Sequence, residues 1–153
     1  MKKYQDIAIL LLRLALAAGF LSAVASRLSL WGKHSSGWTN FLAYAGEVNS
    51  FAPTGIIPTI AVVSTLLEIA IALLLITGYK TKWAAMGATM LSFLFALAMA
   101  VSFSIKEPLD YSVFVVCTAS FLLAGMPHYR WSIDDILMQK KIKKYRQKSS
   151  LNC

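Results

Sequence analysis

The sequence predicts an all-α fold: a polytopic membrane protein built as a bundle of four transmembrane helices. Of its 153 residues, 58% are hydrophobic and 14% are charged, whereas a soluble domain carries about 45–50% apolar and about 25% charged residues. The apolar residues stand in long blocks, and a helix needs about 20 such residues to cross the hydrocarbon core of a bilayer. A soluble core of this size could not cover helices that are apolar on every side. The chain length leaves room for one domain.

The four predicted spans cover about residues 7–28, 56–78, 83–105 and 110–126, and residues 1–131 form the transmembrane domain. Basic residues collect at both ends of the chain and in one short loop. A basic patch can indicate nucleic-acid binding. These lysines flank apolar spans, however, where membrane topology and contact with anionic lipid explain them more simply. We therefore expect membrane lipid as a partner and no nucleic acid.

The first span, from Ile7 to about Leu28, contains one charged residue in its interior, Arg13. Ala23-Val24-Ala25 resembles the cleavage site of a secretory signal. The apolar run is longer than a typical signal core and Arg13 interrupts it, so we expect a retained helix, with cleavage as the alternative.

The connection between the first two spans contains a second helical pattern. Apolar residues recur there at helical spacing, at Trp38, Phe41, Leu42, Ala45 and Val48. The stretch is too short to span a bilayer, so it predicts an interfacial helix in the first outer loop. An ordinary surface loop is the alternative.

Helix-boundary signals place the other spans. Pro58 suits the first turn of the second span, and Gly78 suits its C-terminal cap. The third span is rich in alanine and glycine, which allow close contact between helices. Asp110 is expected to cap the fourth span. That span is short, so residues beyond Pro127 are expected to extend its contact with lipid.

Residues 132–153 predict a basic amphipathic tail helix that lies on the membrane. Ser132 and Asp135 have the spacing of a capping box, and an apolar stripe follows at Ile133, Ile136, Leu137 and Met138. A run of basic residues expected to bind lipid or a partner comes next, at Lys140, Lys141, Lys143 and Lys144. Lysine and arginine gather on the side of the two termini and the Lys80 turn, which predicts an inner-membrane protein with both termini cytoplasmic.

Two ionisable residues lie inside predicted spans, Arg13 and Glu68. A charge at such a depth costs several kcal/mol on insertion scales unless it is paired. The first two spans are consecutive and antiparallel, and helical rise places the two residues about 10 and about 15 Å from the same membrane face. We therefore predict a buried Arg13–Glu68 pair. It either fixes the helix register alone or lines a pocket that binds a ligand or relays a proton.

A secondary polar strip is expected nearer the outer surface, with Ser22, Ser26 and Arg27 on the first span and Ser64 and Thr65 on the second. The alternative is that these hydroxyls bond carbonyls of their own helix. Aromatic residues of the outer loop are expected in the interfacial belt, although Trp31, Trp38 and Phe41 could instead close a pocket from outside. The chain has two cysteines without C-x-x-C or zinc-type spacing, so no metal site is predicted.

The chain resembles the DoxX family of small four-helix bacterial membrane proteins, from Leu11 to Gly125. The first span carries Leu11-Leu12-Arg13-Leu14-Ala15-Leu16, and the second carries Leu66-Leu67-Glu68 followed by Leu74-Leu75-Ile76-Thr77-Gly78. Thr81-Lys82-Trp83-Ala84-Ala85 and Pro108-Leu109-Asp110-Tyr111-Ser112-Val113-Phe114 are similar to the segments that open the family's later helices.

The resemblance implies a role in membrane redox chemistry, because the family includes the small subunit of a thiosulfate:quinone oxidoreductase. It implies an accessory or quinone-interacting subunit, with no intrinsic cofactor besides a possible quinone, and with a redox partner subunit or a second copy as partner. Arg13, Arg27 and Glu68 are the residues that carry over. The family's late histidine of the first span is Ala23 here, while its cation is kept as Arg27. A non-enzymatic scaffold or assembly factor is the alternative, and a small carrier or resistance protein is less favoured. The resemblance leaves open whether the chain is catalytic.

Overall fold

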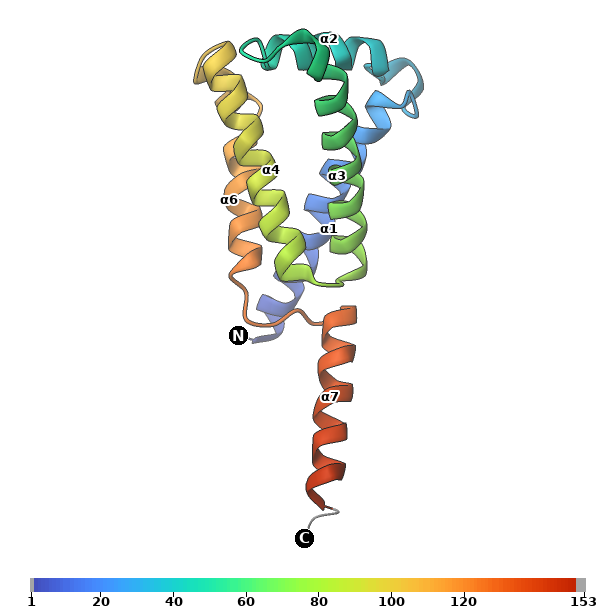
Figure 1. Ribbon diagram of the computed structural model, residues 1–153. Coiled ribbons are helices and arrows are strands. Elements are labelled where there is room, and N and C mark those ends of the chain that lie inside the picture. The colour runs from blue at the N-terminus through green and yellow to red at the C-terminus, as the bar shows by residue number, and fades with distance from the viewer. Residues whose placement is uncertain (1, 151–153) are drawn as a thin grey trace.

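The computed structural model describes the backbone of residues 2–150 and the side chains of residues 3–144 and 147 (Figure 1). Within residues 2–150 the structure is helical and has no β-strand, which confirms the all-α prediction. The helices are α1 Lys2–Arg27, α2 Trp38–Val48, α3 Ile57–Thr77, α4 Thr81–Ser102, α5 Lys106–Asp110, α6 Val113–Ala124 and α7 Ile133–Ser150. Two 3₁₀ turns, Gly32–His34 and Thr54–Ile56, precede α2 and α3.

Three of these helices, α1, α3 and α4, are long and apolar enough to cross a membrane. They lie beside α6 in one bundle, and both chain termini are found at the same end of it (Figure 1). We call this the terminal end. The helix α2 lies across the opposite end, which we call the α2 end (Figure 1). The helix predicted in the first outer loop is thus confirmed as a helix.

The fourth predicted span is shorter than expected. The helix α6 has 12 residues, about 18 Å at 1.5 Å per residue, against a hydrocarbon core of about 30 Å. Continuous helix through residues 111–112 was predicted wrongly, because Ser112 has φ 55 and its left-handed conformation separates α5 from α6. Ser112, and not Asp110, is therefore the N-cap. Asp110 instead forms an ion pair with Lys106 within α5.

The boundaries of α3 follow the predicted signals. Pro58 lies in its first turn, where a missing N–H breaks no helical hydrogen bond. Gly78 ends it with φ 66, and its N–H donates to the carbonyl of Leu74 at 2.9 Å. The residue after it, Tyr79, donates to the same carbonyl at 3.2 Å.

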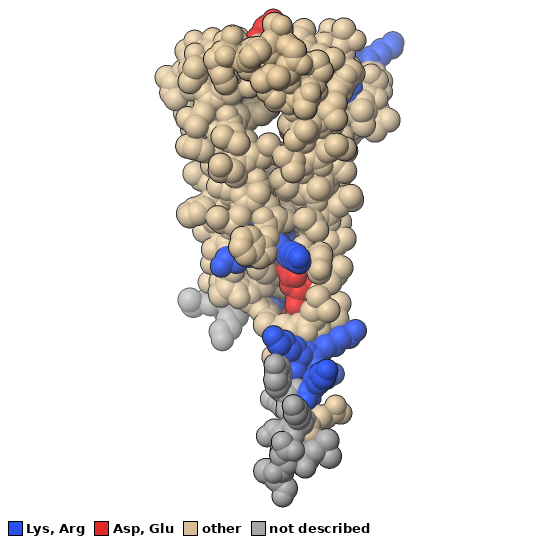
Figure 2. All heavy atoms as spheres, in the orientation of Figure 1, with Lys and Arg blue, Asp and Glu red and all other residues tan. Residues whose placement is uncertain are grey.

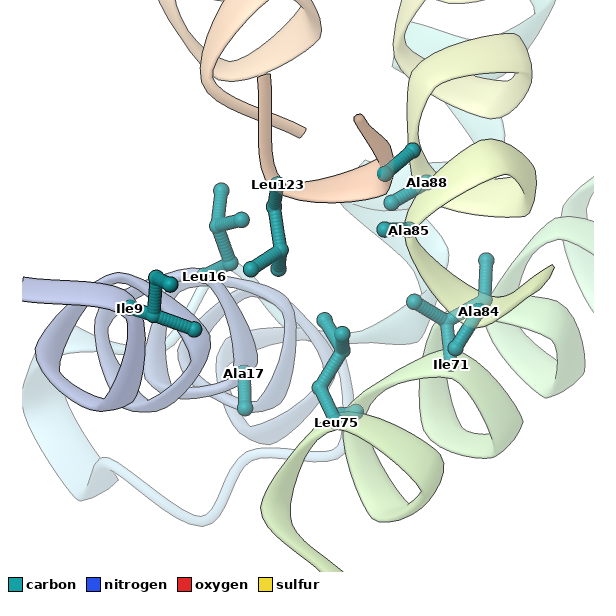
Figure 3. Packing of buried hydrophobic residues seen from close by; sticks show 11 residues of the cluster. Ile9, Leu16, Ala17, Ile71, Leu75, Ala84, Ala85, Ala88 and Leu123 are labelled. Atoms are coloured by element: carbon teal, nitrogen blue, oxygen red, sulfur yellow. The ribbon is translucent and has the colours of Figure 1, made fainter. Parts of the chain in front are cut away.

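The main hydrophobic core lies toward the terminal end and joins four helices (Figure 3). Leu16 and Ala17 of α1 meet Leu75 of α3 and Leu123 of α6 there. The helix α4 packs closely against α6, and four of its buried residues are alanines, Ala84, Ala85, Ala88 and Ala96. Small side chains let two helix backbones approach closely, which is the device predicted for this span.

The tail helix α7 differs from its prediction. It extends away from the bundle at the terminal end (Figure 1). Lys140 follows Ile133 by seven residues and Lys144 follows Leu137 by seven, so basic and apolar side chains share one face. The tail is a helix, as predicted, but its apolar and basic residues are separated along the helix and not across it, so the predicted amphipathic pattern is absent from its described residues. That the tail lies on the membrane stays a prediction.

The start of α7 was predicted correctly in part. The N–H of Asp135 donates to Ser132 Oγ at 3.1 Å, as in a capping box. The carboxylate of Asp135 lies 3.4 Å from His128 instead of bonding back to the N-cap.

Candidate functional site

A buried ion pair joins the end of α1 to the middle of α3. Arg27 Nη1 lies 2.6 Å from Glu68 Oε2, and Nη2 lies 3.0 Å from Oε1, so the pair is bidentate. The two side chains are only 9% and 7% exposed. Arg27 Nη1 also donates to Thr65 Oγ1 at 3.2 Å. From α2, the ring of Phe41 covers the guanidinium, with its centroid 4.0 Å from Cζ. The pair is therefore enclosed by three helices.

The predicted partner of Glu68 was wrong. Arg13 and Glu68 are both buried, as predicted, but they do not contact each other. Arg13 Nε donates to the carbonyl of Leu75 at 3.1 Å, which lies about 10 Å further along α3 than Glu68. The reason is that α1, which begins at Lys2, extends past the end of α3 with its first turns, whereas the prediction aligned the two helix ends. Arg13 is thus level with the last turn of α3, and Arg27 is the arginine that reaches Glu68.

Arg13 binds backbone carbonyls at the terminal end. Its Nη2 donates to Ile76 at 3.2 Å, and its Nη1 lies 3.5 Å from the carbonyls of Arg130 and Trp131. The carbonyls in the last turn of a helix lack intrahelical partners and form the negative end of its dipole. Arg13 thus joins α1 and α3 to the segment that enters α7. A Cβ on Gly78 would lie 2.4 Å from Arg13 Nη2, so glycine is needed at this approach.

The same end is held by further hydrogen bonds. The carboxylate of Asp134 accepts from the N–H groups of Lys80 and Thr81, each at 2.8 Å, and so caps the start of α4. Tyr129 Oη donates to the carbonyl of Leu123 at 3.0 Å. Burial raises the pKa of Tyr129, and nearby Asp134 acts in the same direction, so the hydroxyl keeps the proton that it donates. These contacts fasten the segment between α6 and α7 onto the bundle.

A cavity of about 260 Å³ lies next to the Arg27–Glu68 pair, and we call it the polar cavity. Its walls come from α1, α3, α4 and the start of α6, and they are largely apolar. Polar side chains enter the wall at Arg27, Glu68, Ser92 and Tyr111. Ser92 is 6% exposed, and within the described part of the chain its hydroxyl has no hydrogen-bond partner. Gly19 lines the cavity from α1, two helical turns before Arg27, with nothing within 4 Å of where a Cβ would stand.

The structure brings together only part of the predicted polar strip. Arg27 and Thr65 meet at Glu68, but Ser26 Oγ bonds Ser36 Oγ in the loop after α1 at 3.2 Å. Thr65 Oγ1 also donates to the carbonyl of Ala61 at 2.8 Å, as the alternative interpretation expected. The carbonyl of Ser22 accepts from Trp31 Nε1 at 3.2 Å, and Ser64 Oγ donates to Ala61 at 3.1 Å.

Three residues of the site were not singled out as site residues: Phe41, Ser92 and Tyr111. For Phe41 a pocket-closing role was the minor alternative. Ser92 had a weak signal, since it is a polar residue in the middle of an apolar span. Tyr111 could not be told from an interfacial belt residue. Among the described residues, no three His, Cys, Asp or Glu side chains lie close enough to hold a metal ion.

The fold and the site define a small helical, multi-pass membrane protein whose spanning helices bury an arginine–glutamate pair beside a cavity. The family model of DoxX matches residues 8–102, more than half of the chain. The chain belongs to the DoxX family. The match covers α2, α3 and α4 completely and contains Arg13, Arg27 and Glu68. No curated protein and no solved structure matches the chain.

Proposed function

We propose that this chain is a quinone-interacting subunit of a membrane redox complex and that the quinone head group binds in the polar cavity. The observation that carries the proposal is the arrangement of that cavity. A charged pair and a free hydroxyl face an apolar space between helices that are apolar enough to cross a membrane. Ligand sites are characteristically apolar cavities with a few converging polar groups.

The hydrogen-bond donors of the cavity suit a ring that carries carbonyl oxygens. An arginine has five N–H donors, and three hydrogen bonds lead from Arg27 to Thr65 and Glu68. Two N–H groups of Arg27 therefore remain, together with the hydroxyl of Ser92. A quinone carbonyl accepts hydrogen bonds and has no donor of its own, so these groups match it.

Glu68 and Arg27 have separate roles in this proposal. A bound quinone supplies chemistry that takes up and releases electrons and protons. The carboxyl group of Glu68 would hold or release a proton next to the ring. Arg27 would stay positively charged and orient the ring. A partner subunit would supply the electrons. We place the terminal end at the cytoplasmic face of an inner membrane, because lysine and arginine gather there (Figure 2).

Filling the cavity from Gly19 tests this proposal. Gly19→Phe places a ring in the cavity without striking a neighbouring atom at Cβ. We expect it to weaken binding of a decyl-tailed dimethoxy-methyl-benzoquinone by roughly tenfold or more, while Gly19→Ala keeps the affinity. Quenching of tryptophan fluorescence in detergent measures binding. Equal affinity in all three proteins, or no binding by the unchanged chain, would contradict the proposal.

A specific feature favours the scaffold alternative as a second candidate. The helix α7 extends from the bundle and exposes Lys140, Lys141, Lys143 and Lys144. Such a basic segment could capture an acidic partner surface or anionic lipid.

Removing residues 139–153 tests the scaffold role. The truncated chain is expected to fold, because it keeps the Asp134 cap on α4, and to lose any protein that co-purifies with the full chain. Glutamine at all four lysines is the matched variant that keeps the length of the helix. Unchanged capture by both variants would show that the tail has no such role.

A further inference from the structure

A second hollow lies beside the polar cavity, toward the α2 end of the bundle. This apolar groove of about 660 Å³ runs between α2, α3 and α4. Side chains such as Phe41, Ile60, Leu94 and Val101 line it, and its exposed wall is almost wholly apolar. No charged residue takes part in the described wall. The groove therefore suits a hydrocarbon chain and not a polar ligand.

The groove and the polar cavity share part of their walls. Leu91 and Phe95 of α4 line both hollows. Phe41 lines the groove and also covers the guanidinium of Arg27. Figure 2 shows a gap through the molecule below α2. The polar cavity and the groove are therefore neighbours, with Leu91 and Phe95 as their shared wall.

We infer that the polar cavity takes an amphiphile with a long hydrocarbon tail, and that this tail lies in the groove between α2, α3 and α4. The inference rests on the proposed function, because the head group is the quinone ring at Arg27 and Ser92. Lipid chains are as apolar as the groove, so moving the tail out of lipid contributes little. The gain in affinity comes instead from the covalent link between ring and tail. Once the ring is bound, the tail can enter the groove without a further loss of translational entropy.

Blocking the groove tests the inference without touching the polar cavity. Ala98 lines the groove but not the polar cavity, so Ala98→Phe is expected to fill the groove. Ala70 of α3 is exposed and lines neither hollow, so Ala70→Phe is the matched control. The two probes are dimethoxy-methyl-benzoquinone alone and the same ring with a decyl tail. Comparing each probe between variants in one detergent cancels its partition into the micelle.

We expect Ala98→Phe to weaken binding of the tailed ring by roughly tenfold and to leave binding of the bare ring unchanged. Ala70→Phe should change neither. Ala98→Leu, which adds less volume, should give an intermediate loss and serves if the phenylalanine variant does not fold. Unchanged binding of the tailed ring would overturn the inference and show that ordinary lipid fills the groove.

The failure of the inference can be told from the failure of the proposed function. If Gly19→Phe blocks both rings while Ala98→Phe affects neither, the head-group site stands and the tail site is overturned. If Ala98→Phe weakens binding of the bare ring as much as binding of the tailed ring, the inference is also overturned, because the change would then act on the polar cavity. If the unchanged chain binds neither ring, the proposed function fails and the inference fails with it.

Discussion

Replacing Glu68 with alanine is expected to lower the free energy of unfolding by about 3–5 kcal/mol, the usual effect of removing one partner from a buried ion pair. The change leaves the Arg27 guanidinium buried, with Thr65 as its remaining side-chain hydrogen-bond partner. A charge in that position can neither reach water nor find another carboxylate close by. Unfolding in mixed micelles by titration with dodecyl sulfate, followed by circular dichroism, measures the loss.

A double variant shows whether the loss of stability comes from the missing ion pair or from the unpaired charge that remains buried. In Arg27→Leu/Glu68→Leu no charge remains buried, so its stability should fall within about 2 kcal/mol of the unchanged chain. If the double variant is as unstable as Glu68→Ala, the pair is not the cause of the loss. An effect of Glu68→Ala below about 1 kcal/mol, typical of exposed pairs, would contradict its burial. The stable double variant should nevertheless lose quinone binding, which divides the structural role of the pair from its role in ligand binding.

The sequence was sufficient to find the buried charges but not to pair them. Arg13 and Glu68 were predicted to be buried because they stand inside long apolar blocks, and the structure confirms their burial. Arg13 and Arg27 are 14 residues apart, close to four helical turns, so both lie on the face of α1 toward α3, about 21 Å apart along the axis. Choosing between them required the register of α1 against α3. Side-chain packing sets that register, whereas the helix ends predicted from composition are uncertain by several residues.

Backbone conformation limited the prediction in two other places. The left-handed Ser112 shortens α6, and a serine in a run of apolar residues gave no warning of it. For α7, the capping pair Ser132 and Asp135 correctly marked the start. The direction of the helix depends on tertiary contacts such as those of Asp134 with the α3–α4 turn, which local sequence does not reveal.

The polar cavity lay outside what sequence periodicity can predict. Gly19 lies on α1, Ser92 on α4 and Tyr111 in the turn before α6, and they are brought together by the way these elements pack. The small residues of α4 predicted a close helix contact, yet the sequence did not identify α6 as the helix against which α4 packs most closely. Cavities form where neighbouring surfaces fail to fit, and this depends on all four helices together.

Arg13→Ala is expected to destabilise the terminal end by roughly 3 kcal/mol or more. The carbonyls of Leu75 and Ile76 would lose a charged donor, and hydrogen bonds to charged groups contribute about 1.5–3 kcal/mol each. Arg13→Lys should recover only part of the loss. An ammonium on a flexible stem cannot repeat the planar fork that binds separate carbonyls at once. The same dodecyl sulfate titration measures both variants.

Arg130→Ala is the matched control, because Arg130 is an arginine at the same end whose side chain is 53% exposed and pairs with Asp6 at 3.1 Å. Its partner Asp6 is only 13% exposed, so we expect a loss of about 1 kcal/mol, the upper end for exposed ion pairs and well below that of Arg13→Ala. The Arg130 carbonyl that faces Arg13 is kept. Equal effects of Arg13→Ala and Arg130→Ala would show that Arg13 does not hold the helix ends together.

Quinone binding supplies a second measurement on Arg13. Because Arg13 lies about 21 Å along α1 from Arg27, a folded Arg13→Lys variant should bind the ring as the unchanged chain does.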